Sequence, residues 1–362
     1  MLQDQIRLVA EERGGGDLAL GYAWFLHALQ PVLTGLRSRG EVRFVVNLES
    51  PVATERHEPL SFPPRFNGPP EALEGLARAG VDGVTVANNH ALDQGRAGLI
   101  ETLEAARAAG LGTAGAGLDP ASARAPLILG ESVRVALLAY FLRPGGREEP
   151  ESGATVSILD ERSLVEVASA RERADAVVVT VHWVGEFESE PREEWRGWAE
   201  ALVLAGADAV VCHGPHVLAP AEIVETPDGR QALVAYSLGN LLSNMGWEVY
   251  PAKDLEPGRD SAQRPEAREE ALAVLELTGS SQRPLTGVAM VPVWLMDNRY
   301  AVFRKDAGPR LIYPLPLPGC TVPEPAPCFP ASRPSECEAL ASTLSALAAH
   351  HLIAPLCGPW SS

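Results

Sequence analysis

Short apolar runs and helical patterns alternate along most of the chain. Runs with the character of buried strands cover residues 6–10, 42–48, 84–87, 133–140, 176–181, 209–211 and 232–238. Helical patterns fall between them, at residues 71–79, 96–109, 164–174 and 195–204, after a first one that carries Trp24, Phe25, Leu29 and Val32 at helical spacing. This alternation predicts an α/β fold.

The last part of the chain departs from this alternation. Residues 272–277 and 288–294 are strand-like, and we expect them to close the sheet. From about residue 315 the chain is rich in Pro and Cys, and a helical pattern follows at 336–350. We therefore expect a main domain over 1–314 and a Pro/Cys-rich tail with a terminal helix over 315–362.

Most of the predicted strands end in residues that bind metals or move protons. The endings hold Asp17, Glu49, Asn89 with His90, His182, His213 with His216, and Asn240. Five of them carry an Asp, Glu or His, and they include four of the eight histidines, which a random scatter would not produce. Open α/β sheets gather ligands and catalytic groups at the carboxyl ends of their strands.

Each ending also has an ordinary structural interpretation. Asn88 and Asn89 could bond local backbone in a polar turn beside a satisfied His90. Asp17 could be a helix N-cap, which is the commoner role of an Asp before a helix. Glu49 could be a surface residue after a strand end. The remaining histidines fall outside the pattern and read as ordinary helix or loop residues.

Together the endings offer a specific chemistry. Imidazole, carboxylate and amide oxygen suit divalent zinc, manganese or iron, and two such ions can share a carboxylate and activate water. A histidine beside the ions could protonate a leaving group. Nucleophilic alternatives are weaker, because no GxSxG elbow occurs and the surroundings of Cys212 are basic only through histidines.

Composition limits the choice of partners. The chain of 362 residues is 46% hydrophobic, enough for a packed core, and its formal net charge is −17. Such a charge argues against a nucleic-acid partner and against docking on anionic lipid, and solubility is its simplest explanation. No apolar run reaches the length of about eighteen residues that a membrane span needs, and no charged-then-apolar leader follows Met1.

The cysteines gather at the end of the chain. Cys320, Cys328, Cys337 and Cys357 lie in the Pro-rich tail, at spacings that match no zinc signature. Two disulfides there would imply an oxidising compartment. Four reduced thiols are the alternative.

The strand-end motifs together resemble the CapA family of bacterial capsule-synthesis or poly-γ-glutamate proteins, which are related to calcineurin-like metallophosphoesterases. The resemblance covers about residues 6–300, and its specificity comes from the order of the motifs. They are GGGDLALG around Asp17, NLE at 47–49, ANNHALD at 87–93, HW at 182–183 with Glu186, GAD at 206–208, HGPHV at 213–217 and YSLGN at 236–240.

This resemblance implies a four-layer α/β/β/α sandwich with a dinuclear metal site at one edge. Asp17 would bind the first metal, Glu49 would bridge, and Asn89 and His182 would bind the second. His90 would be the acid or proton shuttle. The remaining implied site residues are His213 and His216 as further imidazole ligands, Ser237 and Asn240 around the pocket, and Asn88, Trp183 and Glu186 toward substrate, with a core role as the alternative for Trp183.

The chain also departs from the family pattern. Ala19 stands where phosphoesterase relatives often carry a His, and Gly214 replaces the first His of a His-Pro-His motif. Val184 replaces the Gly of an HWG motif, and an insertion at 11–15 precedes Asp17. Both one and two bound metal ions therefore remain open.

The resemblance implies a metal-dependent hydrolase that cuts an amide, peptide or phosphoester bond in an exported anionic polymer such as polyglutamate. The alternatives are a peptide epimerase, in which His90 or Asp17 moves an α-proton, and a non-catalytic scaffold in a capsule assembly or export complex with membrane partners. The implied location is outside the cell or in its envelope, with the cytoplasm as the alternative. An acidic surface suits an acidic polymer only if the pocket itself is positive.

Overall fold

The computed structural model describes residues 4–58, 65–143, 152–245, 264–297 and 312–316. The tail cysteines and the helix expected at 336–350 lie outside these ranges. In the described ranges the α-helices are α1 (Asp4–Gly14), α2 (Leu18–Trp24), α3 (Gln30–Arg37), α4 (Glu71–Arg78), α5 (Gly95–Ala108), α6 (Pro120–Arg124), α7 (Glu161–Arg171) and α8 (Glu193–Ala205). Short 3₁₀ turns are η1 (His27–Leu29) and η3 (Pro265–Arg268).

A three-stranded parallel sheet carries the first two strand ends of the site. It has the order β1 (Val45–Asn47), β2 (Gly83–Thr85) and β3 (Gly112–Ala114). Asn47 lies opposite Thr85, and the Leu48 N–H continues the ladder to the Thr85 carbonyl at 2.9 Å. The chain therefore leaves β1 and β2 side by side, toward Glu49 and Asn88.

A six-stranded mixed sheet carries the other strand ends. Its order is β10 (Ala221–Glu225), β11 (Gln231–Ala235), β9 (Ala209–His213), β8 (Ala176–His182), β6 (Val135–Phe141) and β5 (Leu127–Leu129). The four central strands pair in parallel, and the two edge strands are antiparallel. β4 (Ala116–Gly117) and β7 (Thr155–Val156) form a separate two-stranded pair.

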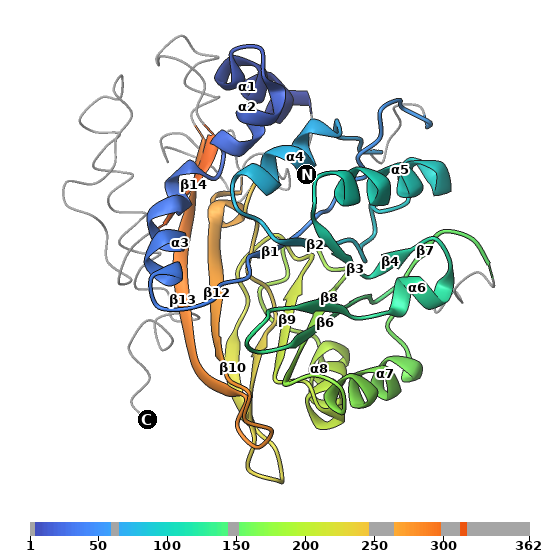
Figure 1. Cartoon of the computed structure of the whole chain (residues 1–362), viewed down its shortest axis with the longest axis vertical. Coiled ribbons are helices and arrows are strands. Elements are labelled where there is room, and N and C mark those ends of the chain that lie inside the picture. The colour runs from blue at the N-terminus through green and yellow to red at the C-terminus, as the bar shows by residue number, and fades with distance from the viewer. Residues whose placement is uncertain (1–3, 59–64, 144–151, 246–263, 298–311, 317–362) are drawn as a thin grey trace.

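Side-chain alternation along β6 divides the core into two parts. Leu137, Ala139 and Phe141 join the cluster that lies toward the three-stranded sheet. Leu138 and Tyr140 join the cluster under α7 and α8, as period-two alternation requires of a strand buried on both faces. In Figure 1, α4 and α5 lie above the three-stranded sheet, and α7 and α8 lie below the six-stranded one. The chain is thus an α/β protein with helices outside two sheets.

Small residues let the two sheets approach each other. A Cβ on Gly112 would lie 2.7 Å from Leu127 Cδ1, and one on Gly115 would lie 2.8 Å from Ala139 Cβ. Gly115 also has φ of 85°, a conformation that glycine adopts at little cost. The sequence therefore keeps these contact points free of side chains.

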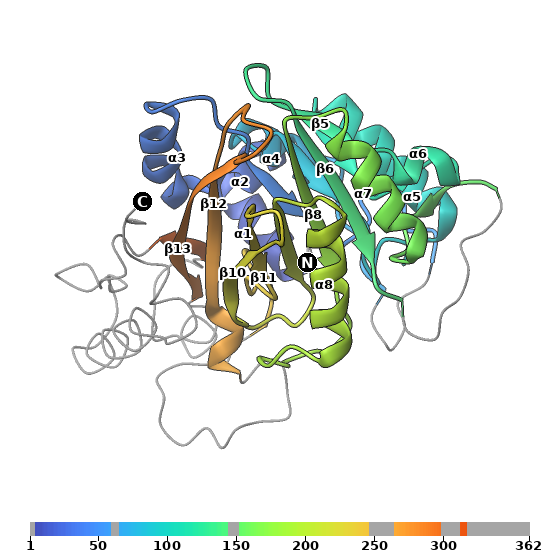
Figure 2. The same cartoon turned by 90° about the horizontal axis from the view of Figure 1, so that it is seen from below.

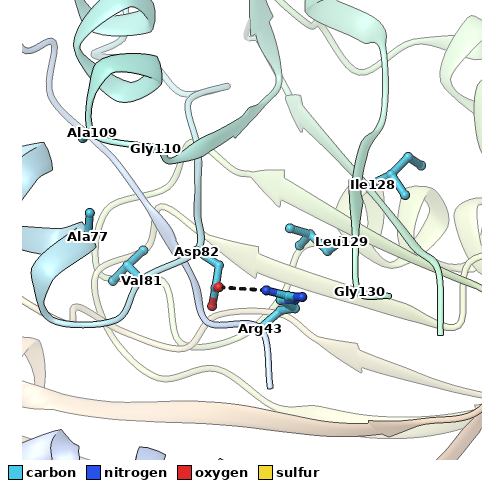
Figure 3. Close-up of a pocket in the computed structure, with 9 residues that line it drawn as sticks. All are labelled: Arg43, Ala77, Val81, Asp82, Ala109, Gly110, Ile128, Leu129 and Gly130. Atoms are coloured by element: carbon cyan, nitrogen blue, oxygen red, sulfur yellow. Dashed lines mark hydrogen bonds and ion pairs between the residues drawn. The ribbon is translucent and has the colours of Figure 1, made fainter. Parts of the chain in front are cut away.

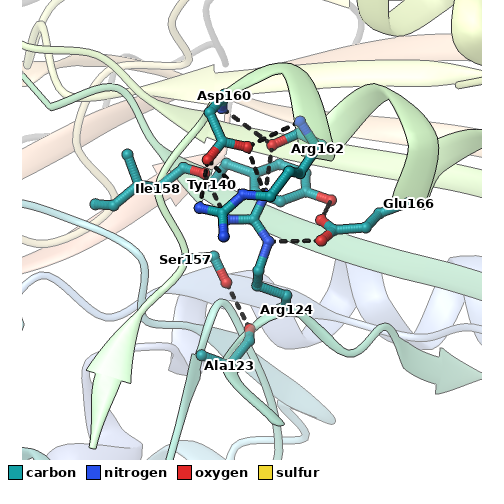
Figure 4. A network of polar contacts seen from close by, with 9 residues as sticks. Ala123, Arg124, Tyr140, Ser157, Ile158, Asp160, Arg162 and Glu166 are labelled. Atoms are coloured by element: carbon teal, nitrogen blue, oxygen red, sulfur yellow. Dashed lines mark hydrogen bonds and ion pairs between the residues drawn. The ribbon is translucent and has the colours of Figure 1, made fainter. Parts of the chain in front are cut away.

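A partly buried polar network fixes α6 and α7 against β6 (Figure 4). The Arg124 guanidinium donates to Glu166 at 2.5 Å and to Asp160 at 2.9 Å. The Tyr140 hydroxyl donates to the other Glu166 oxygen at 2.8 Å, and burial raises the pKa of Tyr140. Asp160 also caps α7 in a capping box with Ser163.

The N-terminal prediction was wrong, because residues 6–10 belong to α1 and not to a strand. Ile6, Val9 and Ala10 are fully buried whereas Leu8 is 38% exposed. Positions i, i+3 and i+4 of a helix share one face, so this spacing already favoured a helix over a continuous buried run.

The prediction that the late strands close the main sheet was also wrong. β12 (Glu269–Leu277) and β13 (Leu285–Asp297) pair with β14 (Ile312–Pro316) in an antiparallel sheet of their own. It stands beside the rest of the fold in Figures 1 and 2 and packs on β11 through the cluster that contains Leu233 and Met290. β14 also crosses the expected domain boundary at residue 314, since Leu315 pairs with Trp294.

The packing of α1 on α2 provides a test of this fold. A Cβ on Gly21 of α2 would lie 1.9 Å from the Ala10 carbonyl oxygen, whereas one on Gly35 of α3 would meet no atom within 4 Å. Gly21→Ala should lower the free energy of unfolding by about 1–3 kcal/mol through overpacking. Gly35→Ala should raise it by up to about 1 kcal/mol through helix propensity. Urea unfolding measures both, and equal effects would contradict the helix contact.

Candidate functional site

The two sheets bring their strand ends together around Glu49. This residue follows β1, whereas His182 and His213 are the last residues of β8 and β9 and lie opposite each other in register. Glu49, His182 and His216 are only 9%, 2% and 5% exposed. The predicted strand ends at Glu49, His182 and His213 with His216 thus meet in one buried cluster.

Glu49 faces two imidazoles at a spacing too long for hydrogen bonds. Its Oε1 lies 3.7 Å from His182 Nε2 and 3.6 Å from His216 Nε2. This oxygen is buried, and within the described ranges it has no hydrogen-bond partner. Two donor atoms that share a tetrahedral zinc ion at about 2.1 Å lie roughly 3.4 Å apart, so these distances suit ligands of one ion better than a hydrogen bond.

The His216 ring is oriented by Asn240. The Asn240 amide nitrogen donates to the carbonyl oxygens of His216 at 3.1 Å and Ala267 at 3.2 Å. Its Oδ1 must therefore be the acceptor that lies 2.8 Å from His216 Nδ1. This places the ring proton on Nδ1 and leaves a lone pair on Nε2, the nitrogen that faces Glu49. His216 also has φ of 62°, a sparsely populated conformation for a non-glycine residue.

His182 and His213 share a hydrogen bond between their Nδ1 atoms, 2.8 Å apart. One ring must donate and the other accept. If His182 donates, its Nε2 keeps the lone pair that a metal ion needs, and His213 carries its proton on Nε2. That His213 nitrogen is buried without a hydrogen-bond partner in the described ranges. The geometry thus fits His213 better as the residue that orients His182 than as a ligand.

A histidine–aspartate pair lies beside this cluster. His90 Nδ1 lies 2.8 Å from Asp93 Oδ2, which also accepts the Phe66 N–H at 2.7 Å. The His90 ring lies 4.4 Å from the Phe66 ring. Asn88 accepts the His90 N–H at 3.1 Å and donates to the Leu48 carbonyl at 2.8 Å. Asn88 therefore joins the chain leaving β1 to the turn that holds His90.

Burial keeps His182 and His213 neutral. Desolvation lowers the pKa of His182 well below 6.5, and the neighbouring His213, His216 and His90 add to the shift. Desolvation and His216 lower the pKa of His213 to about 3. Neutral imidazole is the form that binds metal ions. The donor types and the two distances from Glu49 Oε1 suit a divalent ion, but no group of three or more His, Cys, Asp or Glu side chains in the described ranges is already placed to hold one.

Several predicted site residues lie elsewhere or have other contacts. Asp17 is the N-cap of α2, accepting the Leu20 N–H at 3.0 Å and a bond from Arg78 at 2.7 Å. Its N-cap interpretation is confirmed, and both carboxylate oxygens are engaged. The N-cap bond and Arg78 hold the pKa of Asp17 below its usual value. No contact joins it to Glu49 or the cluster histidines within the described structure.

The other predicted residues divide between core and surface. Trp183 is fully buried and stacks on Trp195 with ring centroids 5.5 Å apart. Its core interpretation is confirmed, and the substrate-facing one was wrong. Ser237 is buried and accepts the Gly239 N–H at 3.3 Å. Asn89 and Glu186 are exposed, and neither has a described contact with the cluster.

The sequence prediction missed two acidic residues. Asp93 stands three residues after His90, inside the ANNHALD motif, so the spacing was a usable signal. Glu270 lies on β12, 1% exposed, and in the described ranges neither carboxylate oxygen has a hydrogen-bond partner. Burial raises its pKa well above the usual value. A Cβ on Gly239, next to Asn240, would lie 3.2 Å from Glu270 Cα.

A separate pocket lies at the opposite edge of the three-stranded sheet (Figure 3). Its lining includes residues that precede the strands: Arg43, Val81, Asp82 and Gly110. Arg43 is bonded there to Asp82 at 3.3 Å and to Glu41 at 2.5 Å. The pocket contains none of the predicted site residues, so it is not the candidate site.

Comparisons with known proteins agree with the strand-end motifs. Residues 1–245 match the family model described as "Bacterial capsule synthesis protein PGA_cap". The chain is 31% identical over 184 residues to the capsule biosynthesis protein CapA of Bacillus anthracis, covering 49% of this chain and 44% of that protein. It is 33% identical over 166 residues to the PGA biosynthesis protein CapA of Bacillus subtilis strain 168, covering 44% of this chain and 42% of that protein.

Two further matches are more distant. The chain is 26% identical over 215 residues to a probable polyglutamine synthesis accessory protein of Mycobacterium tuberculosis, covering 55% of each chain. A solved structure of a hypothetical protein from Thermus thermophilus matches with a TM-score of 0.41 and 18% identity, over 76% of this chain and 94% of that one. This chain spans about half the length of the curated relatives that it matches.

Gly214 provides a steric test of the site. It has φ of 116°, and a Cβ there would lie 2.1 Å from the Trp183 carbonyl oxygen and 3.2 Å from His182 Nε2. Gly229 also has positive φ, 80°, but no atom within 4 Å of its Cβ position. Alanine should cost about 1–2 kcal/mol of unfolding free energy at Gly229 through backbone strain. At Gly214 it should cost about 1–3 kcal/mol more through the clash; equal losses in urea unfolding would contradict the close approach.

The neutral histidines predict acid sensitivity of the metal-free protein. In the unfolded chain a histidine titrates near 6.5, whereas the pKa of His213 in the fold is about 3. Between these values the unfolded state binds more protons. The stabilising contribution of His213 is therefore complete above pH 6.5 and is lost as pH falls toward 3, at about 1.4 kcal/mol per pH unit.

His213→Gln should remove one histidine's share of this slope. Urea unfolding in the presence of a chelator, repeated across the acidic range, measures the slope for both proteins. An identical slope in the wild type and the variant would show that His213 is not held neutral by the fold.

Proposed function

Because the chain belongs to the bacterial capsule synthesis family PGA_cap, with CapA proteins of capsule and poly-γ-glutamate synthesis among its relatives, we propose that it is a metal-dependent hydrolase of that process. Its substrate would be an amide, peptide or phosphoester bond in an anionic polymer or its precursor. The observation that supports this proposal is the buried Glu49 carboxylate that faces two histidine Nε2 atoms without a hydrogen bond in the described ranges.

The residues that would hold the metal are Glu49, His182 and His216. Their donor set suits one divalent zinc, manganese or iron ion. The bound ion would polarise the scissile carbonyl or phosphoryl group and lower the pKa of a bound water. A single ion accords with the present contacts better than two, since Asp17 is occupied by Arg78 and the α2 backbone.

His90 is the residue proposed to move the proton. Its Nδ1 lies 2.8 Å from Asp93 Oδ2, so Nδ1–H donates a hydrogen bond to the carboxylate and Nε2 is left free to exchange a proton with substrate. Asp93 would also stabilise the imidazolium when Nε2 takes up a proton. His90 would thus accept a proton during attack and return it to the leaving group, while Asn88 keeps its backbone in place.

We also propose a specific layer architecture and a cellular location for the protein. The arrangement of helices outside two facing sheets accords with a four-layer sandwich of the calcineurin-like metallophosphoesterase type. In the described ranges, no helix is both long and apolar enough to cross a bilayer. We propose that the protein acts at the cell envelope, together with membrane components of capsule synthesis.

Metal content tests the proposal directly. Purified protein should take up about one equivalent of zinc or manganese, and Glu49→Gln and His216→Gln should each lose most of it. His57→Gln is the control, since His57 pairs with Glu101 on the surface. His90→Gln should keep the metal and lose about 100-fold or more in hydrolysis of γ-glutamyl peptides or phosphoesters.

Two outcomes would contradict the proposal. Wild-type protein that binds neither zinc nor manganese would remove the metal centre and leave a scaffold role in a capsule complex. Metal uptake that is equal in wild type and Glu49→Gln would place the ion elsewhere.

A further inference from the structure

Arg143 stands at the edge of the candidate site without a counter-charge in the described ranges. The Leu142 N–H donates to the His182 carbonyl at 3.0 Å, which extends the pairing of β6 with β8 by one residue. Arg143 follows at once and is half-buried. It stands two residues after Phe141, the last residue of β6, whose ring lies 5.8 Å from the His182 ring.

This lack of a partner is unusual in the described part of the chain. Most arginines there donate to a carboxylate, a hydroxyl or a carbonyl oxygen, and those whose side chains have no hydrogen bond or ion pair are exposed except Arg143. The exposed ones are Arg39, Arg96, Arg107, Arg134 and Arg283. A half-buried charge without a partner is costly, so Arg143 is suited to bind an oxyanion that arrives from solution.

A second arginine lies on the other side of the cluster. Arg264 precedes η3, whose Ala267 carbonyl accepts from Asn240. Its guanidinium lies 4.1 Å from the Phe187 ring centroid, and its Nε is buried without a hydrogen-bond partner in the described ranges. Its ion pair with Glu266, at 3.0 Å, is partly exposed. Exposed ion pairs contribute little free energy, so this pair can be exchanged for another carboxylate.

The backbone of Phe187 fixes the ring against which Arg264 stacks. Phe187 has φ of 63°, a strained conformation for an aromatic residue. Its N–H donates to the Pro215 carbonyl at 2.7 Å, one residue before His216. The stacked arginine is thereby fixed relative to the loop that carries His216.

The two arginines flank the cluster along the row of strand ends. The strand order β11-β9-β8-β6 puts Arg264 on the β11 side and Arg143 after β6, with His213 and His182 between them. Three strand spacings amount to about 14 Å. An extended chain that lies across the strand ends would meet both arginines and the buried cluster.

We propose that Arg143 and Arg264 bind carboxylates of a polyanionic chain on either side of the Glu49–His182–His216 cluster. The inference rests on the proposed function and specifies how that site recognises its substrate. The planar guanidinium group matches a carboxylate in a bidentate way. The pair also provides positive charge where a chain of net charge −17 would otherwise repel an acidic polymer.

Binding of a short oligo-γ-glutamate to the full chain tests this proposal without any need for turnover. Isothermal titration of chelator-treated and zinc-loaded protein would compare wild type with Arg143→Gln and Arg264→Gln. Each variant should weaken binding about tenfold through loss of a charge-assisted contact, and added salt should weaken it in the wild type. Arg143→Lys should retain part of the affinity.

Arg107→Gln is the matched control, because Arg107 is exposed at the far end of α5 without a described side-chain partner. Its affinity should equal that of the wild type, and thermal unfolding would verify that all variants fold. Wild-type protein that does not bind the oligomer, or arginine variants that bind it as Arg107→Gln does, would overturn the proposal. So would inorganic phosphate that binds with the same arginine dependence while the oligomer does not bind.

The outcomes separate this proposal from the proposed function. Arginine-dependent binding in protein that takes up no metal would support the anion site and remove the hydrolase assignment. Normal metal uptake with arginine-independent binding would do the reverse.

Discussion

The burial of the Glu49 carboxylate is the constraint on which the arrangement of the site depends. One of its oxygens is enclosed without a hydrogen bond in the described structure and faces two imidazole nitrogens. The same burial keeps His182 neutral, so that ring offers a lone pair or an N–H group and no full positive charge. A carboxylate in such a place is costly unless a cation, a hydrogen-bond donor or a proton relieves its charge. The hydrogen bonds that His213 and Asn240 make with His182 and His216 have the same effect on both rings, because each leaves an imidazole Nε2 directed at Glu49.

The site exists only because two sheets meet. Glu49 and His90 come from the three-stranded sheet, whereas His182 and His213 come from the six-stranded one. The distance between the sheets is set by glycine and alanine contacts such as Gly115 against Ala139. Asn88 joins the chain after β1 to the turn after β2, and Asn240 joins His216 to the turn before β12. Asn88 therefore ties together the loops on the side of the three-stranded sheet, and Asn240 ties the His216 loop to the third sheet through its contact with Ala267.

The sequence predicted the strand ends well because short apolar runs and their polar endings are local features. Glu49, His90, His182 and His216 were found in this way, and the order of the motifs identified the family. Residues 6–10 were misread because the IRLVA segment was taken as a short apolar run, although the spacing of Ile6, Val9 and Ala10 fits one face of a helix. The separate sheet of β12, β13 and β14 depends on long-range pairing that periodicity cannot reveal. The role of Asp17 could not be predicted because it depends on Arg78, which lies far along the chain. The core position of Trp183 depends in the same way on its stacking with Trp195.

Charge at the site and charge over the whole chain have different origins. The net charge of −17 is spread over a surface that water and salt screen within about 10 Å, so it governs solubility more than local binding. Inside the cluster the described cationic groups are few, and a bound ion would dominate the local field. Arginines at the rim act at intermediate range, where partial burial reduces screening. An acidic protein can thus recognise an acidic chain if its positive groups are concentrated where the polymer must lie, along the row of strand ends between β6 and β11.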